Sequence, residues 1–370
     1  MPFPGSQHAN SIGIAYFLGR NKWLLRIIGL LLIAYPAYRV FTAGKGWQQL
    51  LLASILILFG IVFYLFNFRY EADRMFYQPA NKNFASAAGN RVDSNNLVIG
   101  VEINGEAKAF PIQIIGYHHQ VRDTIGHMPV MITYCTVCRT GRVYSPVVND
   151  HPETFRLVGM DHFNAMFEDA TTKSWWRQAT GMAISGPLKG AALKEIPSRQ
   201  MTLSAFLKEY PGAEILQPDT LYTKEYEDLA GYDKGTIKGS LETRDSASWR
   251  FKSWVIGVKT PDAERAYDWN ELVKQTIIQD SVAGHPIVIL LENDSASFHV
   301  FSRAMDGSTL QFDKAPGENI FTDRSTHSRW NMEGLCLDGP LKDKRLQTLP
   351  AYQEFWHSWK QFHPNTTQYK

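Results

Sequence analysis

The stretch FPIQIIGYHHQVRDTIGHMPVMITYCTVCRTGRVYSP, Phe110 to Pro146, concentrates more reactive chemistry than any other part of this 370-residue chain. A histidine pair, His118 and His119, is followed by an apolar run, Val130 to Tyr134. A short apolar run bounded by turn residues predicts a buried strand. Two cysteines, three positions apart, follow where that strand should end.

These cysteines, Cys135 and Cys138, define the chemistry expected of the stretch. Two thiols at this spacing can hold one metal ion or close one disulfide, and nearby imidazoles can complete a coordination shell. Thiolates with thioethers favour Cu(I), whereas two thiolates with two imidazoles suit tetrahedral zinc. The sequence therefore predicts a copper or zinc site whose candidate ligands are Cys135, Cys138, His118, His119 and His162. Other side chains of suitable chemistry are His127, Met128, Met131 and Met160.

Two other functions fit the same residues. In a dithiol oxidoreductase, Arg139 and Arg142 would lower the pKa of a thiol, although such a thiol usually lies at a helix N-terminus. The residues after Cys138 instead predict a turn into a strand. The second alternative is a non-catalytic scaffold subunit of a membrane complex. Its exterior aromatic residues would include Trp356, Trp359 and Phe362, although these are also expected to form the apolar face of a last helix.

Charge and motifs exclude several function classes. The formal net charge is +2 and there is no polybasic tract, so we expect no nucleic-acid partner. Three cysteines, with Cys336 far from the other two, are too few for a disulfide-stapled scaffold. The sequence contains no phosphate loop, dinucleotide-binding fingerprint, haem attachment motif or nucleophile elbow. Whether the protein is an enzyme stays open.

Two apolar segments near the N-terminus predict a transmembrane helical hairpin. After a polar tail, residues 1–22, the first runs from Trp23 to Val40, and the second, Trp47 to Phe68, carries no charged side chain. The second has the length that a bilayer requires. Because only Thr42 to Gly46 lies between them, both chain ends are expected on one side of the membrane. The bilayer and other membrane proteins are thus the expected partners.

The rest of the chain contains an internal repeat. The sequence VIGVEINGEAKAF, Val98 to Phe110, recurs as VIGVKTPDAERAY, Val255 to Tyr267, at an offset of about 157 residues. We therefore predict an α+β, β-rich fold with two tandem homologous domains, at residues 95–217 and 253–370, joined by a linker at 218–252. The domains follow the transmembrane hairpin at residues 23–68.

The repeat also serves as an internal control. Positions that both copies share are expected to be scaffold, for example Gly100 and Gly257 in strands. At the offset above, Cys135 and Cys138 lie opposite Glu292 and Ser295, so the second copy folds without the thiols. This difference favours a functional role for the cysteines in the first copy, with the second copy degenerate.

The same residues resemble a known family, the domain of unknown function 3179. The resemblance rests on VIGVEINGEAKAFPI, on YHHQVRDTIGHMPVMITYCTVCRTG and on the later block SWWRQATGMAISGPLKG. By position, the family's motif histidine corresponds to His118 and its cysteines to Cys135 and Cys138, while His119 replaces the usual acidic residue. The resemblance implies no activity. Because members resemble exported proteins, it implies an extracytoplasmic soluble domain, although the positive charges flanking the hairpin slightly favour cytoplasmic ends.

Overall fold

The computed structural model of the chain describes residues 5–237, 241–315 and 317–370, which divide into two compact units. The smaller unit contains the chain up to Tyr77, Glu153–Arg177 and Met182–Ala192. The larger unit contains Gln78–Pro152, Gln178–Gly181 and Leu193–Lys370. Strands predominate outside the N-terminal helices, so the predicted α+β, β-rich class is confirmed.

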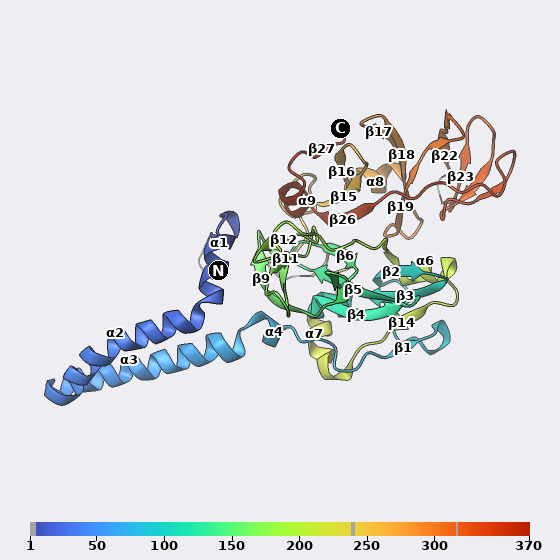
Figure 1. Cartoon of the computed structure of the whole chain (residues 1–370). Coiled ribbons are helices and arrows are strands. Elements are labelled where there is room, and N and C mark those ends of the chain that lie inside the picture. Colours follow the sequence, from blue (N-terminus) through green and yellow to red (C-terminus); the bar gives the residue numbers. More distant parts are fainter. Residues whose placement is uncertain (1–4, 238–240, 316) are drawn as a thin grey trace. The chain divides into compact units, whose positions relative to one another are not determined.

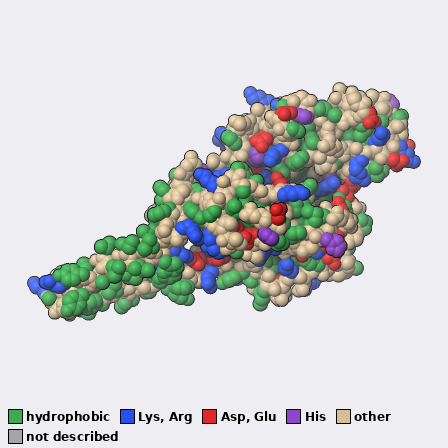
Figure 2. Space-filling model, viewed as in Figure 1, with side chains coloured by type: hydrophobic (Ala, Val, Ile, Leu, Met, Phe, Trp, Pro, Cys, Tyr) green, Lys and Arg blue, Asp and Glu red, His purple; other side chains and the backbone are tan. Residues whose placement is uncertain are grey.

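The smaller unit begins with two long apolar helices that lie side by side (Figure 1). They are α2 (Lys22–Ala43) and α3 (Gly46–Tyr64), and a π-helical turn, η2 (Leu65–Arg69), extends α3. The segments Lys22–Ala43 and Gly46–Arg69 have mean hydropathies of 1.6 and 2.5, and hydrophobic side chains cover the hairpin in Figure 2. Both predicted helices are therefore present and are long and apolar enough to cross a membrane.

Two shorter helices flank this hairpin. The segment expected to be a polar tail contains a 3-10 turn, η1 (Ser6–His8), and a helix, α1 (Ile12–Arg20). After the hairpin comes α4 (Ala72–Met75).

An antiparallel sheet of four strands completes the smaller unit, in the order β12-β11-β10-β9. The N-terminal segment is attached to it because the Gln7 Oε1 atom accepts a hydrogen bond of 2.9 Å from the backbone N–H of Phe163. After the hairpin, Asp73 forms an ion pair of 3.3 Å with Arg156. The strands are β9 (Phe155–Asp161), β10 (Asn164–Asp169), β11 (Trp175–Arg177) and β12 (Ala183–Ser185).

The larger unit contains two sets of elements, which we name the N-terminal half-domain (residues 84–152 and 193–217) and the C-terminal half-domain (residues 253–370). The N-terminal half-domain has a mixed sheet of order β14-β3-β2-β13, to which β1 adds at the β14 edge, and an antiparallel sheet of order β4-β5-β6. Its elements are β1 (Phe84–Ala85), η3 (Ala87–Gly89), β2 (Leu97–Ile103), β3 (Glu106–Pro111), α5 (Ile112–His118), β4 (Gln120–Ile125), β5 (Met128–Cys135), β6 (Thr140–Tyr144), β7 (Val147–Val148), β8 (His151–Pro152), β13 (Arg199–Thr202), α6 (Leu203–Glu209) and β14 (Glu214–Leu216).

The C-terminal half-domain repeats the same strand orders. Its sheets run β27-β16-β15-β26 and β17-β18-β19, and a further sheet, β25-β24-β23-β22, has the order seen for β12-β11-β10-β9 in the smaller unit. The elements are β15 (Trp254–Lys259), β16 (Glu264–Asp268), α8 (Trp269–Gln275), β17 (Ile277–Val282), β18 (His285–Leu291), β19 (Phe298–Ser302), β20 (Ala304–Met305), β21 (Ser308–Thr309), β22 (Phe312–Lys314), β23 (Ile320–Asp323), β24 (Arg329–Asn331), β25 (Cys336–Asp338), β26 (Ala351–Phe355), α9 (Trp356–Phe362) and β27 (Thr367–Gln368).

Glycines at matching positions have the same packing role in both half-domains. A Cβ atom on Gly100 would lie 2.3 Å from the Phe206 ring, and one on Gly257 would lie 2.2 Å from the Trp359 ring. Contacts this short do not occur, so each helix can approach its sheet only over a glycine. The expectation that these glycines are scaffold fits this packing.

The segment between the half-domains, residues 218–252, packs into the larger unit instead of lying free. It forms η4 (Thr220–Tyr222) and α7 (Thr223–Asp228). Tyr226 and Tyr232 are buried. Residues 238–240 lie outside the described part of the chain. The predicted linker therefore contributes side chains to the region around the cysteines.

Candidate thiol site

Cys135 and Cys138 lie at the two ends of one tight turn between β5 and β6. The backbone N–H of Cys138 donates to the carbonyl of Cys135 at 3.3 Å, and that of Arg139 donates to Thr136 at the same distance. Arg139 has a φ of 54°, which reverses the chain into β6. The predicted strand and the turn that follows it are both present, and they bring the two thiols together.

Neither cysteine forms a disulfide, and both thiols are shielded from solvent, since Cys135 is 1% and Cys138 0% exposed. The Cys138 thiol is hydrogen-bonded to the Cys135 thiol and to the hydroxyl of Ser358. Burial, and next the hydrogen bond with Cys135, raise the pKa of Cys138 well above its usual value. At neutral pH this thiol is therefore protonated, which makes it a weak nucleophile.

The C-terminal half-domain covers the turn. The carbonyl of Cys138 accepts a hydrogen bond of 3.0 Å from the backbone N–H of Phe355, where β26 meets α9. His357 Nε2 lies 3.2 Å from the carbonyl of Val137, and the hydroxyls of Ser358 and Thr140 are 3.1 Å apart. Three polar groups, two in the turn and one at the start of β6, thus bind the start of α9.

The segment between the half-domains closes the turn from another direction. The Tyr232 hydroxyl donates a hydrogen bond of 2.8 Å to the carbonyl of Thr136. Thr136 also packs on α5, because a Cβ atom on Gly116 would lie 3.0 Å from its Cγ2 atom. A reagent can reach the sulfurs only if one of these covering groups moves.

The two arginines after the thiols are buried and fully engaged. Arg139 Nε donates to Gln353 Oε1 at 2.8 Å, and its guanidinium lies 3.8 Å above the Trp254 ring. Arg142 pairs with the buried carboxylate of Glu354. Burial opposes the charge of Arg142, but nearby negative charge, Glu354 foremost, raises the pKa of Arg142 overall. Arg142 is thus a structural cation of the contact between the half-domains.

His118, at the C-terminal end of α5, is fully buried in a cluster of tyrosines. Its Nε2 atom lies 2.7 Å from the hydroxyl of Tyr226, and its ring centroid lies 4.9 Å from that of Tyr117 and 5.1 Å from that of Tyr222. Burial raises the pKa of Tyr226, so its hydroxyl stays protonated at neutral pH. The hydrogen bond between Tyr226 and His118 holds the imidazole in one orientation.

His119 ends α5 with a φ of 61°, a conformation that reverses the chain into β4. Its Nδ1 atom lies 3.0 Å from the carbonyl of Tyr117. Burial lowers the pKa of His119 to about 4, so the imidazole is neutral at physiological pH. The matching position in the C-terminal half-domain, Thr276, has nearly the same φ of 60°.

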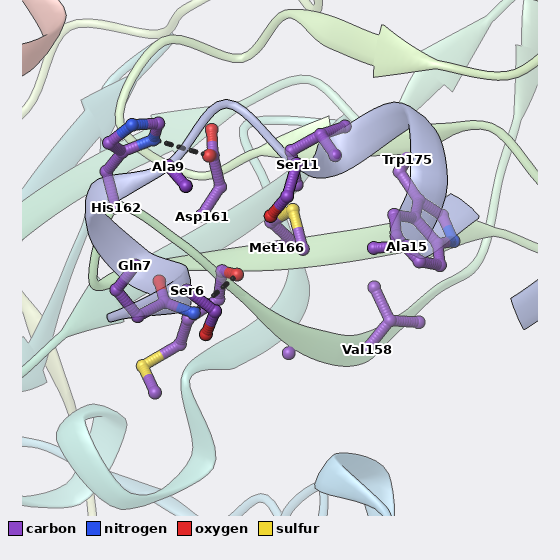
Figure 3. Close-up of a pocket in the computed structure, with 13 residues that line it drawn as sticks. Ser6, Gln7, Ala9, Ser11, Ala15, Val158, Asp161, His162, Met166 and Trp175 are labelled. Atoms are coloured by element: carbon purple, nitrogen blue, oxygen red, sulfur yellow. Dashed lines mark hydrogen bonds and ion pairs between the residues drawn. The ribbon is translucent and has the colours of Figure 1, made fainter. Parts of the chain in front are cut away.

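His162 belongs to the smaller unit, whereas the other four predicted ligands belong to the larger one. Its Nδ1 atom lies 2.6 Å from Asp161 Oδ1 (Figure 3). Asp161 also accepts a hydrogen bond of 2.8 Å from Arg177 Nε. The pair borders a pocket of about 60 Å³ that Ser6 and Ser11 also line.

The described part of the chain contains no group of three or more His, Cys, Asp or Glu side chains placed to hold a metal ion. The structure brings the two cysteines together, and it places His118 and His119 next to each other at the end of α5. Both imidazoles are engaged with tyrosine oxygens. Metal binding at the predicted residues therefore stays a prediction.

Comparison with known protein families identifies the chain. The family model described as "Protein of unknown function (DUF3179)" matches residues 78–366. The chain belongs to the DUF3179 family. The match takes in both half-domains and the segment between them, so the DUF3179 unit is larger than the first repeat on which the resemblance in the sequence was based.

The other comparisons add little about this DUF3179 protein. No curated protein matches it. A solved structure described as "The reduced complex between oxygenase and ferredoxin in carbazole 1,9a-dioxygenase" matches 70% of this chain and 71% of that chain at 10% identity. Its TM-score of 0.20 is too low to carry an argument about fold or function.

Several residues of the DUF3179 site were not found from the sequence. They come from the segment between the half-domains, from the end of β26 and from α9, and the smallest separation from a cysteine is 226 − 138 = 88 positions: Tyr226, Tyr232, Glu354 and Ser358. A tyrosine alone in a polar segment carries no signal of burial. The later part of the repeat held the one usable signal. There GPLKG at Gly186 recurs as GPLKD at Gly339, an offset of 339 − 186 = 153 residues, which aligns the start of α9 with the start of α6 and Gln353 with Gln200.

Proposed function

We propose that this DUF3179 protein is anchored to a membrane by its helical hairpin and that Cys135 and Cys138 form a reversible dithiol–disulfide couple. One observation carries the proposal: the two cysteines, neither of them in a disulfide, lie at the two ends of one tight turn, where their thiols interact with each other. Disulfide formation needs two sulfurs that can approach to bonding distance without movement of the main chain, and a tight CxxC turn meets that need.

The reaction consumes a small disulfide as oxidant. Each cysteine loses one proton and one electron as the bond between Cys135 and Cys138 forms, and the small disulfide is reduced to two thiols. Attack requires a thiolate, which burial of Cys138 disfavours. The couple is therefore expected to exchange slowly and to follow the redox state of its compartment, unlike a fast exchange catalyst with an exposed thiol.

Bound Cu(I) is the second candidate. The observation that favours it over zinc is that, among the described residues, no group of three or more His, Cys, Asp or Glu side chains is placed to hold a metal ion, so the two sulfurs are the candidate ligands. Zinc in proteins almost always takes four ligands in its structural sites, whereas soft thiolates select Cu(I). A zinc site would require His118 and His119 to leave their tyrosine partners. The scaffold function is the outcome if the thiols bind no metal and do not oxidise.

We further propose that the half-domains are homologous and arose by duplication. They share strand orders in every matching sheet. The soluble part is proposed to lie outside the cytoplasm, where a disulfide persists once formed. The N-terminal segment and the rest of the chain would then share that side, because the hairpin crosses the bilayer twice.

The test compares the detergent-solubilised full chain with a C135S/C138S variant and a C336S control. Purified protein is analysed for bound copper and zinc, and its mass is measured after incubation with oxidised glutathione. The proposal expects metal-free protein and a loss of about two hydrogens per molecule. That loss should occur in C336S and be absent from C135S/C138S. Stoichiometric copper lost in the double variant would instead establish the second candidate.

A further inference from the structure

We propose that the open edge of β27 in the C-terminal half-domain binds an extended, acidic segment of a partner protein as an added strand. The argument for binding at this edge does not depend on the redox chemistry proposed for Cys135 and Cys138. Main-chain pairing with a free sheet edge is a common way to bind an extended peptide, and side chains beside the edge then select the sequence.

The N-terminal half-domain shows how such an edge is filled. Its matching strand, β14, pairs with β3 on one side and with β1 on the other, and Figure 1 shows β1 next to β14. The β1 pairs are Phe84 with Leu216 and Ala85 with Ile215. The N–H of Gln217 then donates to the carbonyl of Asn83 at 2.8 Å. The chain therefore supplies its own covering strand at this edge.

The equivalent edge of the C-terminal half-domain has no such strand. Among the described residues, β27 pairs with β16 alone and ends the order β26-β15-β16-β27. The pairs Ile215 with Ala109 and Gln368 with Ala266 occupy matching positions of the two sheets. Gln368 thus corresponds to Ile215, which β1 covers.

The main-chain groups of Gln368 face the open edge. Along a strand, the N–H and C=O groups of successive residues point to opposite neighbours. The N–H of Tyr369 donates to the carbonyl of Ala266 in β16 at 2.9 Å, so the groups of Gln368 point away from β16. Thr367 and Gln368 are both exposed, which leaves one donor and one acceptor for an added strand.

A groove and a pair of lysines lie beside this edge. The groove has a volume of about 500 Å³ and is lined by residues of β27 and by Trp356 and Lys360 of α9. Lys370 lines it as well, and Lys360 Nζ lies 5.9 Å from the Trp356 ring centroid. No Asp or Glu side chain is among the lining residues, so the two lysine ammonium groups favour a segment that carries Asp or Glu side chains.

Lysines on an edge strand have another known use, which is to prevent pairing with other chains. The two uses differ in one respect. A guarded edge rejects every strand, whereas a docking edge accepts an acidic one and depends on the N–H of Gln368.

The experiment uses the full chain in detergent, immobilised, and a peptide library in which Asp or Glu alternates with randomised apolar residues. The test variant is Q368P, which removes the outward N–H and leaves the bonds to β16 intact, since proline is tolerated at a sheet edge. Q368A is the matched control, and K360E/K370E tests the charge preference. Thermal unfolding checks that each variant keeps its fold.

We expect the wild type and Q368A to retain library peptides at least tenfold more than Q368P at equal protein loading. K360E/K370E should lose the acidic peptides and retain a matching library in which Lys or Arg alternates with apolar residues. Equal retention by the wild type and by a folded Q368P would overturn the proposal, and so would the absence of retention by the wild type. The absence of retention would assign the lysines to protection of the edge.

Discussion

Gln200 of β13 donates a hydrogen bond of 2.8 Å from its Nε2 atom to Oε1 of Gln353 in β26. The two glutamines occupy the same place in their half-domains, because Gln200 pairs with Ile99 in β2 and Gln353 with Ile256 in β15. A contact between equivalent positions is the mark of a two-fold interface, in which each surface meets its own counterpart.

Other contacts between the two half-domains are also made by matching positions. Phe355, at the end of β26, binds the turn after β5 through its N–H and the carbonyl of Cys138. Thr202, the matching end of β13, binds the turn after β18, where its N–H donates to Ser297 Oγ at 2.9 Å. We interpret the larger unit as two sister folds joined like the subunits of a dimer, with the thiols in one of the two matching turns.

The two glutamines should differ in their effect on stability. Q200L removes one hydrogen bond and is expected to cost about 1 kcal/mol in the free energy of unfolding. Q353L also removes the acceptor of the buried Arg139 Nε, so it should cost about 3 kcal/mol. Urea unfolding of the detergent-solubilised chain measures both. If the two variants lose the same free energy of unfolding, the hydrogen bond from Arg139 to Gln353 contributes nothing to stability.

The ion pair between Arg142 and Glu354 predicts strong coupling. Both side chains are almost fully buried, so R142M should leave an unpaired carboxylate and cost about 3–5 kcal/mol. In R142M/E354L neither charge of the pair remains, so the free energy of unfolding should fall by less than it does in R142M. A double-mutant cycle by the same urea unfolding measures the coupling. If the losses of unfolding free energy in R142M and E354L simply add up to the loss in R142M/E354L, the two side chains do not interact directly.

His119 predicts a loss of stability in mild acid. Burial lowers its folded pKa from 6.5 to about 4. Between these values the unfolded chain binds more protons than the folded one, so stability falls as the pH is lowered through this range. The full contribution of His119 is on the order of 3 kcal/mol. H119N, which tolerates the same positive φ, should show a shallower decline between pH 6.5 and 4. Parallel stability curves for the two proteins would show that His119 is not the titrating group.

The helical hairpin predicts that both chain ends lie on one side of the membrane. Reporter domains fused before Met1 or after Lys370 should respond identically in intact cells to a protease that cannot cross the membrane. We expect both to be cleaved, as for an extracytoplasmic domain. Cleavage of the C-terminal reporter alone would mean that the hairpin does not cross twice, and protection of both would place the domain in the cytoplasm.

Local parts of the site could be predicted from the sequence. The apolar run Val130 to Tyr134 gives most of β5, and the polar residues after Cys138 give the turn into β6. Each of these features depends on neighbours within a few positions, where side-chain period and turn chemistry determine the structure.

The cover of the thiols could not be predicted in this way. Phe355 and Ser358 lie more than 200 positions after the turn, and their contacts depend on how two sheets pack. The tyrosine partner of His118 comes from a segment whose polarity suggested a linker. Buried hydrogen bonds of this kind become visible only when the packing is known, although the repeat already aligned Gln200 with Gln353.

The central claim is that Cys135 and Cys138 interconvert between dithiol and disulfide. Its most direct test is to equilibrate the C336S chain with defined ratios of reduced and oxidised glutathione, trap free thiols with a maleimide, and count the labels per molecule by mass after unfolding. As the proportion of oxidised glutathione rises, we expect the count to fall in one reversible step from two labels per molecule to none. This step should be absent from C135S/C138S/C336S. Two labels at every ratio, after incubation long enough for the count to stop changing, would contradict it.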